Sequence, residues 1–320
     1  MSEHFIKNIE IKNFKCFEDF KAEGFGRVNL IGGKNNVGKT AFMEAVYVNV
    51  YATNVNTFIC ALNNIKFMRE NLNVLANNCV YSKQDFIEIS NTILVKSNIN
   101  KAYFKINEEN GIKKYYFEYQ NNITDININD FSFSEKSLEN IVFIDNFGLF
   151  NSHIMNHYSS VQRKDEEDFL NCILQKFDNR IESFKIIDKL PQCKVKGQWL
   201  ELTELGDGIR HLVSIVTSLY ISEHGYLFID ELDNGIHYTM LDELWKVILE
   251  VSDKLNVQVF ATTHSKECIE SYARVAENLD DEDITMTTMA RNLKDELKAL
   301  VWDRAQFFSE MEQNHEVRGW

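Results

Sequence analysis

The amino-acid sequence predicts an α/β protein in which a mostly parallel sheet is flanked by helices and accompanied by an antiparallel β subdomain. Three observations lead to this fold class. Strands and helices alternate in the C-terminal half, a glycine-containing loop links a strand to a helix near the N-terminus, and apolar residues recur with period two across about residues 84–135. The 320 residues suit one or two domains, and the apolar and charged fractions of 44% and 26% are typical of folded globular proteins.

The N-terminal segment contains the order strand, strand, loop and helix. Alternating apolar and polar residues predict a half-buried strand over 5–17. Its apolar side carries Ile6, Ile9, Ile11 and Phe14. Residues 27–31 form a second apolar strand, which runs into the loop 33–40 and then into a helix over 41–51.

The middle of the chain is the least regular part. One or two helices are expected over 55–80, although repeated asparagines weaken the helical pattern because their side chains compete for backbone hydrogen bonds. An antiparallel β region is expected over about 84–135. It includes a hairpin over 102–119, for which Asn110-Gly111 supplies the turn residues.

From residue 139 onward, strands and helices alternate as they do in parallel sheets. The expected strands are 141–145, short strands within 184–200, 226–230, 257–261 and a closing hairpin of 284–290 with 297–302. The expected helices are 165–178, 207–222, 238–255, 265–276 and a short one after the hairpin. Strand 141–145 is a continuous apolar run, as expected for a strand that is buried on both faces.

The most specific motif is Gly33–Thr40, a complete GxxxxGK[ST] phosphate loop between a strand and a helix. Backbone amides of such a loop wrap the β and γ phosphates, its lysine neutralises their charge, and the hydroxyl after it ligates Mg²⁺. The expected nucleotide contacts are Gly33, Asn35, Asn36, Val37, Gly38, Lys39 and Thr40, with Thr40 also a metal ligand. An incidental polar turn is the alternative, but the strand and helix that the motif requires are both predicted.

Two later strands end in residues suited to the same site. Strand 226–230 ends in an acid pair, in which Asp230 would hold Mg²⁺ and Glu231 would deprotonate the attacking water. Strand 257–261 leads to His264, a second catalytic candidate that in isolation would be read as structural. Carboxyl ends of parallel strands meet at one edge of a sheet, so Thr40, Asp230 and His264 are expected to share one site.

Four segments together carry a family resemblance: GKNNVGKT, LGDGIRH, LFIDELDNGIH and FATTHSKECI. Their order and spacing resemble the ABC-type ATPase heads of the OLD and SMC-like group, in particular bacterial AAA-type ATP/GTP-binding proteins. The resemblance implies an ABC-type P-loop ATPase head in which the loop 33–40 is Walker A, Glu231 is catalytic and His264 is the switch histidine. It also implies that ATP and Mg²⁺ are held between two copies, the signature loop of one chain capping the γ phosphate bound by the other.

Leu205–Gly208 lies where such heads carry a Leu-Ser-x-Gly signature, and Gly206, Asp207 and Gly208 are its expected nucleotide contacts. This segment departs from that signature, because Gly206 stands in place of the serine and lacks its hydroxyl, and Asp207 adds a negative charge. Asp207 is alternatively the N-cap of its own helix, and Arg210 would restore a positive group. The neighbouring D-loop candidates are Asp233 and His237, and the glutamines open for a Q-loop role are Gln84, Gln120 and Gln162.

We expect the ATPase head to comprise residues 1–52 plus 139–320, with 53–138 as an inserted helical and antiparallel β region. The expected partners are a second copy, in an ATP-dependent homodimer or higher oligomer, and a separately encoded effector such as a nuclease, in bacterial anti-phage defence. The alternative is a DNA-clamping ATPase of DNA repair or maintenance. The net charge of −14 disfavours nucleic acid except at a local basic patch. The candidates for that patch are Arg180, Lys185, Lys189, Lys194 and Lys196, or else these form an ordinary solvated face.

Several functions are not expected. No apolar run approaches the roughly 20 residues of a membrane span, and the N-terminus lacks the pattern of a secretory signal, so a cytoplasmic protein is predicted. About 45 residues follow the helix after His264, too few for a nuclease domain in the same chain. The six cysteines show no zinc or disulfide spacing and are expected to be reduced thiols.

Overall fold

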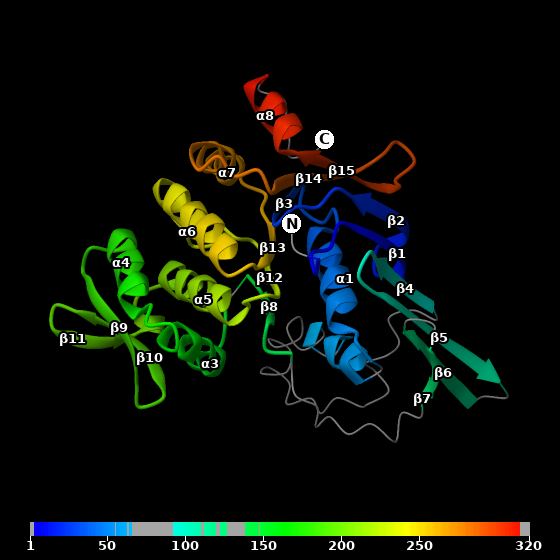
Figure 1. The fold of residues 1–320 in the computed structure, drawn as a ribbon, viewed down its shortest axis with the longest axis horizontal. Coiled ribbons are helices and arrows are strands. Elements are labelled where there is room, and N and C mark those ends of the chain that lie inside the picture. Colours follow the sequence, from blue (N-terminus) through cyan, green and yellow to red (C-terminus); the bar gives the residue numbers. More distant parts are fainter. Residues whose placement is uncertain are drawn as a thin grey trace.

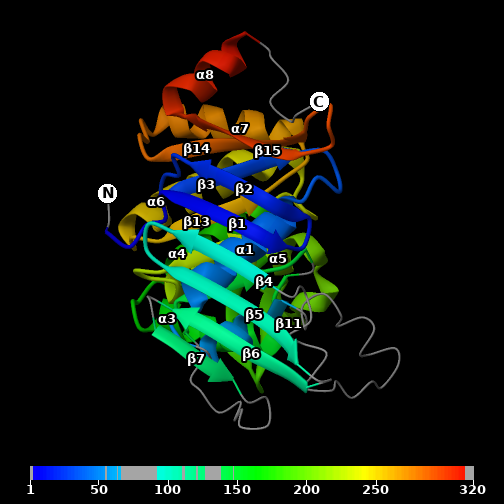
Figure 2. The same cartoon turned by 90° about the vertical axis from the view of Figure 1, so that its right-hand side faces the viewer.

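The structure, a computed structural model, describes residues 3–54, 56–62, 64–65, 92–109, 112–119, 122–126, 138–146 and 148–313. These residues form two six-stranded sheets, a three-stranded sheet and the helices that cover them (Figures 1 and 2). Residues 56–62 and 64–65 are helical, whereas most of the segment expected to be helical over 55–80, together with the Asn110-Gly111 turn, lies outside the described residues. The five described cysteines are free thiols, and Cys79 falls outside the described part.

The central sheet is mixed and mostly parallel, as predicted, with the strand order β15-β14-β3-β13-β12-β8. Its parallel strands are β3 (Val28–Gly33), β8 (Ile141–Ile144), β12 (Tyr226–Ile229), β13 (Gln258–Thr262) and β14 (Ile284–Arg291), and β15 (Leu297–Asp303) pairs with β14 antiparallel. Strands β3, β12 and β13 are buried at every position because helices cover both faces of the sheet.

The two faces of this sheet are covered differently (Figure 1). Helix α1 lies on one face, where the rings of Phe143, Phe228 and Phe260 stack across three neighbouring strands at centroid distances of 5.9 and 5.6 Å. Helices α5, α6 and α7 lie on the other face. The helix bounds are α1 Lys39–Tyr51, α5 Asp207–Ile221, α6 Leu241–Lys254, α7 Lys266–Asn278 and α8 Arg304–Glu312, and the 3₁₀ turn η3 (Tyr238–Met240) precedes α6.

The N-terminal strand prediction needs a correction. Residues 5–17 are not one strand: β1 (Asn8–Phe14) and β2 (Phe17–Glu23) form a hairpin that turns at Lys15 and Cys16. Lys15 has a φ of 52°, in the left-handed region, and ends the extended run. The expected apolar side is nevertheless correct, because its four members are all buried: Ile6, Ile9, Ile11 and Phe14.

The hairpin belongs to an antiparallel sheet with the order β2-β1-β4-β5-β6-β7, seen face-on in Figure 2. The added strands are β4 (Thr92–Ser97), β5 (Lys101–Glu109), β6 (Ile112–Tyr119) and β7 (Asn122–Ile126). Because β4 pairs with β1, the strands of the middle segment extend the N-terminal hairpin as one sheet. A domain division at residue 53 therefore stays a prediction, and it would run through a continuous sheet.

A smaller unit connects β8 to α5. It contains α3 (Asn151–Gln162), α4 (Glu167–Phe177), the sheet β9 (Ile181–Ile187), β10 (Leu190–Val195) and β11 (Gln198–Glu201), and the turn η2 (Leu202–Glu204). Helix α3 was not expected, because its segment NSHIMNHYSSVQ is mostly polar. Ile154, Tyr158 and Val161 nevertheless supply a buried stripe at helical spacing.

Candidate active site

The phosphate loop is fixed by contacts from two distant segments of the chain. Gly38, the N-cap of α1, has a φ of 98°, and a β-carbon there would lie 2.8 Å from Cys16 Sγ and 3.1 Å from Leu297 Cδ1. Lys15 forms an ion pair with Glu44, which is buried in α1, and so anchors the β1–β2 turn against the same helix. Only glycine meets both the conformation and the space at this position.

Lys39 lies folded over the loop that precedes it. Its Nζ donates hydrogen bonds to the carbonyl oxygens of Gly33 at 2.8 Å and Lys34 at 3.0 Å. Burial lowers the pKa of Lys39, and nearby carboxylates, first Asp230 and then Glu231, oppose that shift. The ammonium group is thus a cation held by neutral carbonyls, and phosphate oxygens are stronger acceptors for it.

The other predicted phosphate contacts lie in the same loop. Asn35 and Asn36 are exposed, and Asn36 has a left-handed φ of 61°. Val37 is buried, so its side chain anchors the loop to the interior of the protein. The loop ends at the N-terminus of α1, where unpaired backbone N–H groups and the helix dipole favour an anion.

Hydrogen bonds bring the phosphate loop and the end of strand β12 together. The Thr40 hydroxyl donates to Asp230 Oδ1 at 2.9 Å, and the Thr262 hydroxyl donates to the same oxygen at 2.7 Å. The Thr262 oxygen also accepts from the backbone N–H of Glu231 at 2.9 Å. Thr262, at the end of β13, was missed from the sequence. Its only signal was a hydroxyl residue placed where strand 257–261 ends.

The oxygen atoms of Thr40 and Asp230 fit an Mg²⁺ ion. Mg²⁺ prefers oxygen ligands and is usually held in proteins by one or two side chains together with water and substrate phosphates. The described residues contain no group of three or more histidine, cysteine or acidic side chains arranged for a metal. A magnesium ion shared with a nucleotide is therefore the kind of site that this oxygen pair suits.

The remaining catalytic candidates follow the same two strands. Glu231 is half-buried, with a left-handed φ of 51°, which turns the chain sharply after Asp230. Asp233 accepts a hydrogen bond of 2.6 Å from the Thr263 hydroxyl, joining the loop after β12 to the end of β13. His264 follows directly, is exposed, and precedes Ser265, the N-cap of α7. All of these residues lie at the carboxyl edge of the central sheet.

The signature segment differs from expectation in its cap. Gly206, not Asp207, is the N-cap of α5, and no side chain in the described part of the chain caps this helix. The N-cap prediction for Asp207 is therefore wrong: Asp207 is the first helical residue and is exposed. Gly208 packs against the loop after β12, where a β-carbon would lie 2.2 Å from the carbonyl oxygen of Gly235.

Two neighbouring candidates form hydrogen bonds within their own chain. Arg210 donates to the carbonyl oxygen of Leu149 and to Asn151 Oδ1, holding the start of α3. It therefore does not extend freely as a substitute positive group. His237 is the N-cap of η3, and its Nδ1 accepts from the backbone N–H of Thr239 at 3.4 Å.

The strand register identifies an acid that the sequence analysis overlooked. Ile144 of β8 is aligned with Ile229 of β12, and the N–H of Asp230 donates to the carbonyl oxygen of Ile144 at 2.9 Å. Asp145 therefore lies level with Asp230, one strand further along the sheet. Of the Q-loop candidates, Gln162 is exposed at the end of α3, whereas Gln84 and Gln120 lie outside the described residues.

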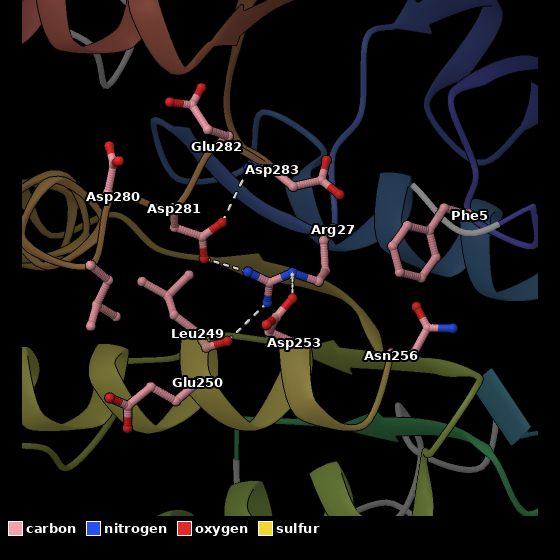
Figure 3. Close-up of a pocket in the computed structure, with 11 residues that line it drawn as sticks. Phe5, Arg27, Leu249, Glu250, Asp253, Asn256, Asp280, Asp281, Glu282 and Asp283 are labelled. Carbon is pink, nitrogen blue, oxygen red and sulfur yellow. Dashed lines mark hydrogen bonds and ion pairs between the residues drawn. The ribbon is translucent and has the colours of Figure 1, made fainter.

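A hollow of about 720 Å³ lies at the opposite edge of the sheet, where β3 begins (Figure 3). Arg27 projects into it, forms an ion pair with Asp281 and lies 3.6 Å from Asp253. Its other acids are Glu250, Asp280, Glu282 and Asp283. This hollow is rich in carboxylates and is therefore electrostatically unsuited to a polyphosphate.

Comparisons with known proteins show which proteins this chain resembles. A family model described as "AAA domain, putative AbiEii toxin, Type IV TA system" matches residues 195–270. An ATP/GTP phosphatase of Helicobacter pylori is 27% identical, with 86% of this chain and 89% of that protein aligned. The DNA replication and repair protein RecF of Clostridioides difficile is 30% identical over 26% of this chain and 22% of its own length.

Solved structures show the same fold. An SMC head bound to the C-terminal winged-helix domain of ScpA has a TM-score of 0.55 at 10% identity, covering 95% of this chain and 99% of that one. An SMC head with an extended coiled coil, bound to the C-terminal domain of ScpA from Pyrococcus furiosus, has a TM-score of 0.54 at 10% identity, covering 97% and 99%. Among the residues that the structure describes, none of the helices has both the length and the apolar character of a membrane span.

The family model, the aligned relative and the solved structures lead to one conclusion. The chain has an SMC head-like fold and resembles the ABC-type, SMC-like P-loop ATPases.

Proposed function

We propose that this chain binds ATP with Mg²⁺ at the phosphate loop, holds it between two copies of itself and hydrolyses it. The observation that carries this proposal is the hydrogen bond between Thr40 and Asp230, because it joins the phosphate loop to the end of strand β12. The Lys39 ammonium group, which could bind an anion, lies in the same loop. The similarity to an ATP/GTP phosphatase over most of both chains supports the same activity.

The residues divide the work of hydrolysis among them. Lys39 exchanges its two carbonyl acceptors for phosphate oxygens, and the loop N–H groups hold the same phosphates. Thr40 and Asp230 would hold Mg²⁺, which supplies charge neutralisation for the phosphates when bound. Glu231 accepts a proton from the attacking water, and the N–H···O bond to Thr262 fixes its backbone. His264 would contact the γ phosphate from the next strand.

A second copy would complete the site through its signature loop. Gly206 and Asp207 are exposed at the start of α5, and among the residues that the structure describes no side chain caps this helix. A helix N-terminus in this state binds anions. ATP bound between two copies would join them only while the γ phosphate remains, so hydrolysis would reset an assembly switch.

The switch would control a separately encoded effector such as a nuclease, in the cytoplasm and in anti-phage defence. The family model for an AAA domain with a toxin–antitoxin description supports a role of this kind. The inserted segment 53–138 is the proposed partner surface and the remainder is the proposed head.

A second candidate, a DNA-clamping ATPase, is favoured by the partial similarity to RecF. The proposed basic patch does not favour it. Arg180 forms an ion pair with Asp178 at 2.7 Å, and Lys194 lies 3.4 Å from Glu182, so two of its five cations are already neutralised. A filter-binding assay with duplex DNA at two salt concentrations tests this candidate, which predicts salt-dependent binding that needs ATP.

The main proposal is tested by comparing wild type with Glu231→Gln and with Glu277→Gln, a control at an exposed position of α7. With Mg²⁺ and ATP, we expect Glu231→Gln to accumulate as a dimer in light scattering while its phosphate release falls at least about a hundredfold. The control should behave like wild type. A Glu231→Gln protein that stays monomeric and hydrolyses ATP at the wild-type rate would contradict the role of Glu231.

A further inference from the structure

The order of strands in the central sheet indicates on which side the nucleoside of a bound nucleotide would lie. The phosphate loop follows β3, whereas Asp230 and Glu231 follow β12, which is separated from β3 by β13. The γ phosphate would lie on the β12 side, because the attacking water stands between it and Glu231. The nucleoside would then leave the loop on the other side of β3, where the sheet continues with β14 and β15.

A hollow of about 710 Å³ lies on that side and adjoins the phosphate loop. It is lined by the β1–β2 turn and β2 on one side and by the β14–β15 hairpin on the other, and β15 runs beside β2 (Figures 1 and 2). Two of its lining residues, Cys16 and Leu297, are the ones that a β-carbon on Gly38 would approach to 2.8 and 3.1 Å. The hollow and the loop therefore share a wall, and this volume is typical of small-molecule sites.

Strand register places Arg291 beside the phosphate loop. Strand β14 pairs with β3 in parallel as far as Met289 and Gly33, so Arg291 lies just beyond the level at which the loop begins. Its partner across the hairpin is Leu297. The Arg291 guanidinium donates to the carbonyl oxygen of Asp295 at 2.8 Å and lies 3.5 Å from the Asp295 carboxylate. The hairpin thus holds this guanidinium at the wall of the hollow, with 37% of the side chain exposed.

The charges of this hollow suit an uncharged group. Four lysine or arginine side chains and four acidic side chains line it, so its formal charges cancel. The hollow around Arg27 at the opposite edge of the sheet instead combines one arginine with six acids. The ribose and base of a nucleotide carry no net charge. Carboxylates accept hydrogen bonds from ribose hydroxyls, and a base stacks well on the plane of a guanidinium group.

We propose that the hollow between the β1–β2 and β14–β15 hairpins holds the ribose and base of the bound nucleotide, and that Arg291 stacks on the base. The phosphate loop then binds the phosphates, and the two hairpins bind the nucleoside. The C-terminal hairpin becomes part of the nucleotide site, although it contains none of the four motif segments. The inference rests on the proposed binding of nucleotide at the phosphate loop.

A comparison of ADP with inorganic pyrophosphate separates nucleoside binding from phosphate binding, because both ligands carry two phosphates. In calorimetry with Mg²⁺, we expect wild type to bind ADP at least about tenfold more tightly than pyrophosphate, the effect of stacking one base. Arg291→Ala should weaken ADP binding about tenfold and leave pyrophosphate binding within about twofold of wild type. Arg274→Ala is the matched control, because Arg274 of α7 is also an exposed arginine with an acidic partner, and it should change neither affinity.

Thiol labelling tests the same inference in the wild-type chain. Cys16 lines the hollow, whereas Cys172 of α4 is an exposed thiol elsewhere. Burial raises the pKa of the Cys16 thiol, so alkylation by N-ethylmaleimide is measured at alkaline pH. ADP should slow the alkylation of Cys16 more than pyrophosphate does, because only ADP fills the hollow. Peptide mass spectrometry should show the same rate for Cys172 with either ligand and with none.

Three outcomes would overturn the inference while ligand still binds at the phosphate loop. Equal wild-type affinities for ADP and pyrophosphate would mean that the nucleoside contacts nothing. An equal loss of both ligands in Arg291→Ala would mean that Arg291 acts on the phosphates or on the fold, and no loss of either would mean that it touches no part of the nucleotide. If wild type binds neither ADP nor pyrophosphate, the proposed function itself fails.

Discussion

The phosphate loop is packed within its own chain, whereas the signature loop faces open space. A β-carbon on Gly38 would clash with Cys16 and approach Leu297, but one on Gly206 would meet no described atom within 4 Å. Both glycines have a positive φ, 98° and 92° respectively, but their ψ angles are 13° and 162°. The two loops therefore differ both in backbone conformation and in their surroundings.

This difference indicates how the two loops would be used. Cys16, Leu297 and the Lys15–Glu44 ion pair fix the phosphate loop before any ligand arrives, as pre-organised binding requires. In the signature loop, Gly208 is in tight contact with Gly235, and no described side chain caps the helix that follows. Under the proposed function, the phosphate loop is formed within a single chain, whereas the signature loop would contact a nucleotide bound by a second copy.

The largest effect is expected at the lysine of the phosphate loop. Lys39→Ala removes the half-buried cation that would meet the phosphates, so turnover should fall by at least about a hundredfold, with loss of fluorescent-ATP binding. Lys34→Ala changes an exposed side chain of the same loop and should retain most of both. Equal activity of the two variants would show that nucleotide binds elsewhere.

The paired glycines give the next largest effect. Gly38→Ala combines a left-handed φ with a clash, so it should cost about 2 kcal/mol or more of unfolding free energy and abolish nucleotide binding. Gly206→Ala has backbone strain without the clash, because a φ of 92° with a ψ of 162° suits glycine, and should cost about 1–3 kcal/mol. Its nucleotide binding as a monomer should stay normal while ATP-dependent dimerisation weakens. Chemical denaturation measures the unfolding free energy, and light scattering measures ATP-dependent dimerisation. If both variants lost nucleotide binding and dimerisation to a similar extent, the two loops would not differ in their roles.

Two buried threonines test whether the hydrogen bonds of Thr262 hold Asp230 and Glu231 in place beside the phosphate loop. Thr262→Val leaves Asp230 without one donor and the Glu231 N–H without its acceptor, which should cost roughly 1–3 kcal/mol and slow turnover. Thr287→Val is the control, because the Thr287 hydroxyl of β14 is buried without a hydrogen-bond partner among the described residues. Its unfolding free energy should stay the same or rise. If Thr287→Val were less stable in urea than Thr262→Val, the bridging role of Thr262 would be refuted.

The smallest expected effect is a pH dependence that arises from His157 of α3, whose Nδ1 lies 3.0 Å from the Ser218 hydroxyl of α5. Burial, and secondarily the nearby His153, lowers the pKa of His157 to about 4, so the folded state favours the neutral ring. The unfolded chain takes up the proton near pH 6.5, and stability is therefore lost as the pH falls from there toward 4. Between about pH 7 and pH 6 this one group should account for less than about 1 kcal/mol. Denaturation of His157→Gln should show a correspondingly weaker pH dependence.

Sequence patterns predicted the parts of the site that depend on local chemistry. The phosphate loop, the acid pair after β12 and the parallel sheet follow from residue types at fixed spacing within short segments. Thr262 and Asp145 were missed because their importance arises from strand register, which no local pattern encodes. The N-cap of α5 was misassigned because Asp207 is a common capping residue, whereas the left-handed φ of Gly206 is a property of the folded chain. The β1–β2 turn was missed for a related reason, since Lys15 and Cys16 are not typical turn residues.

The most direct measurement mixes two inactive variants. Lys39→Ala lacks a working phosphate loop, and Gly206→Trp adds a large side chain at the exposed start of the signature helix, where a β-carbon meets no described atom within 4 Å. If ATP is held between copies, a mixed dimer contains one intact site, and an equal mixture should regain about a quarter of wild-type turnover. A mixture no more active than its separate components would contradict the claim that each site is built from two chains.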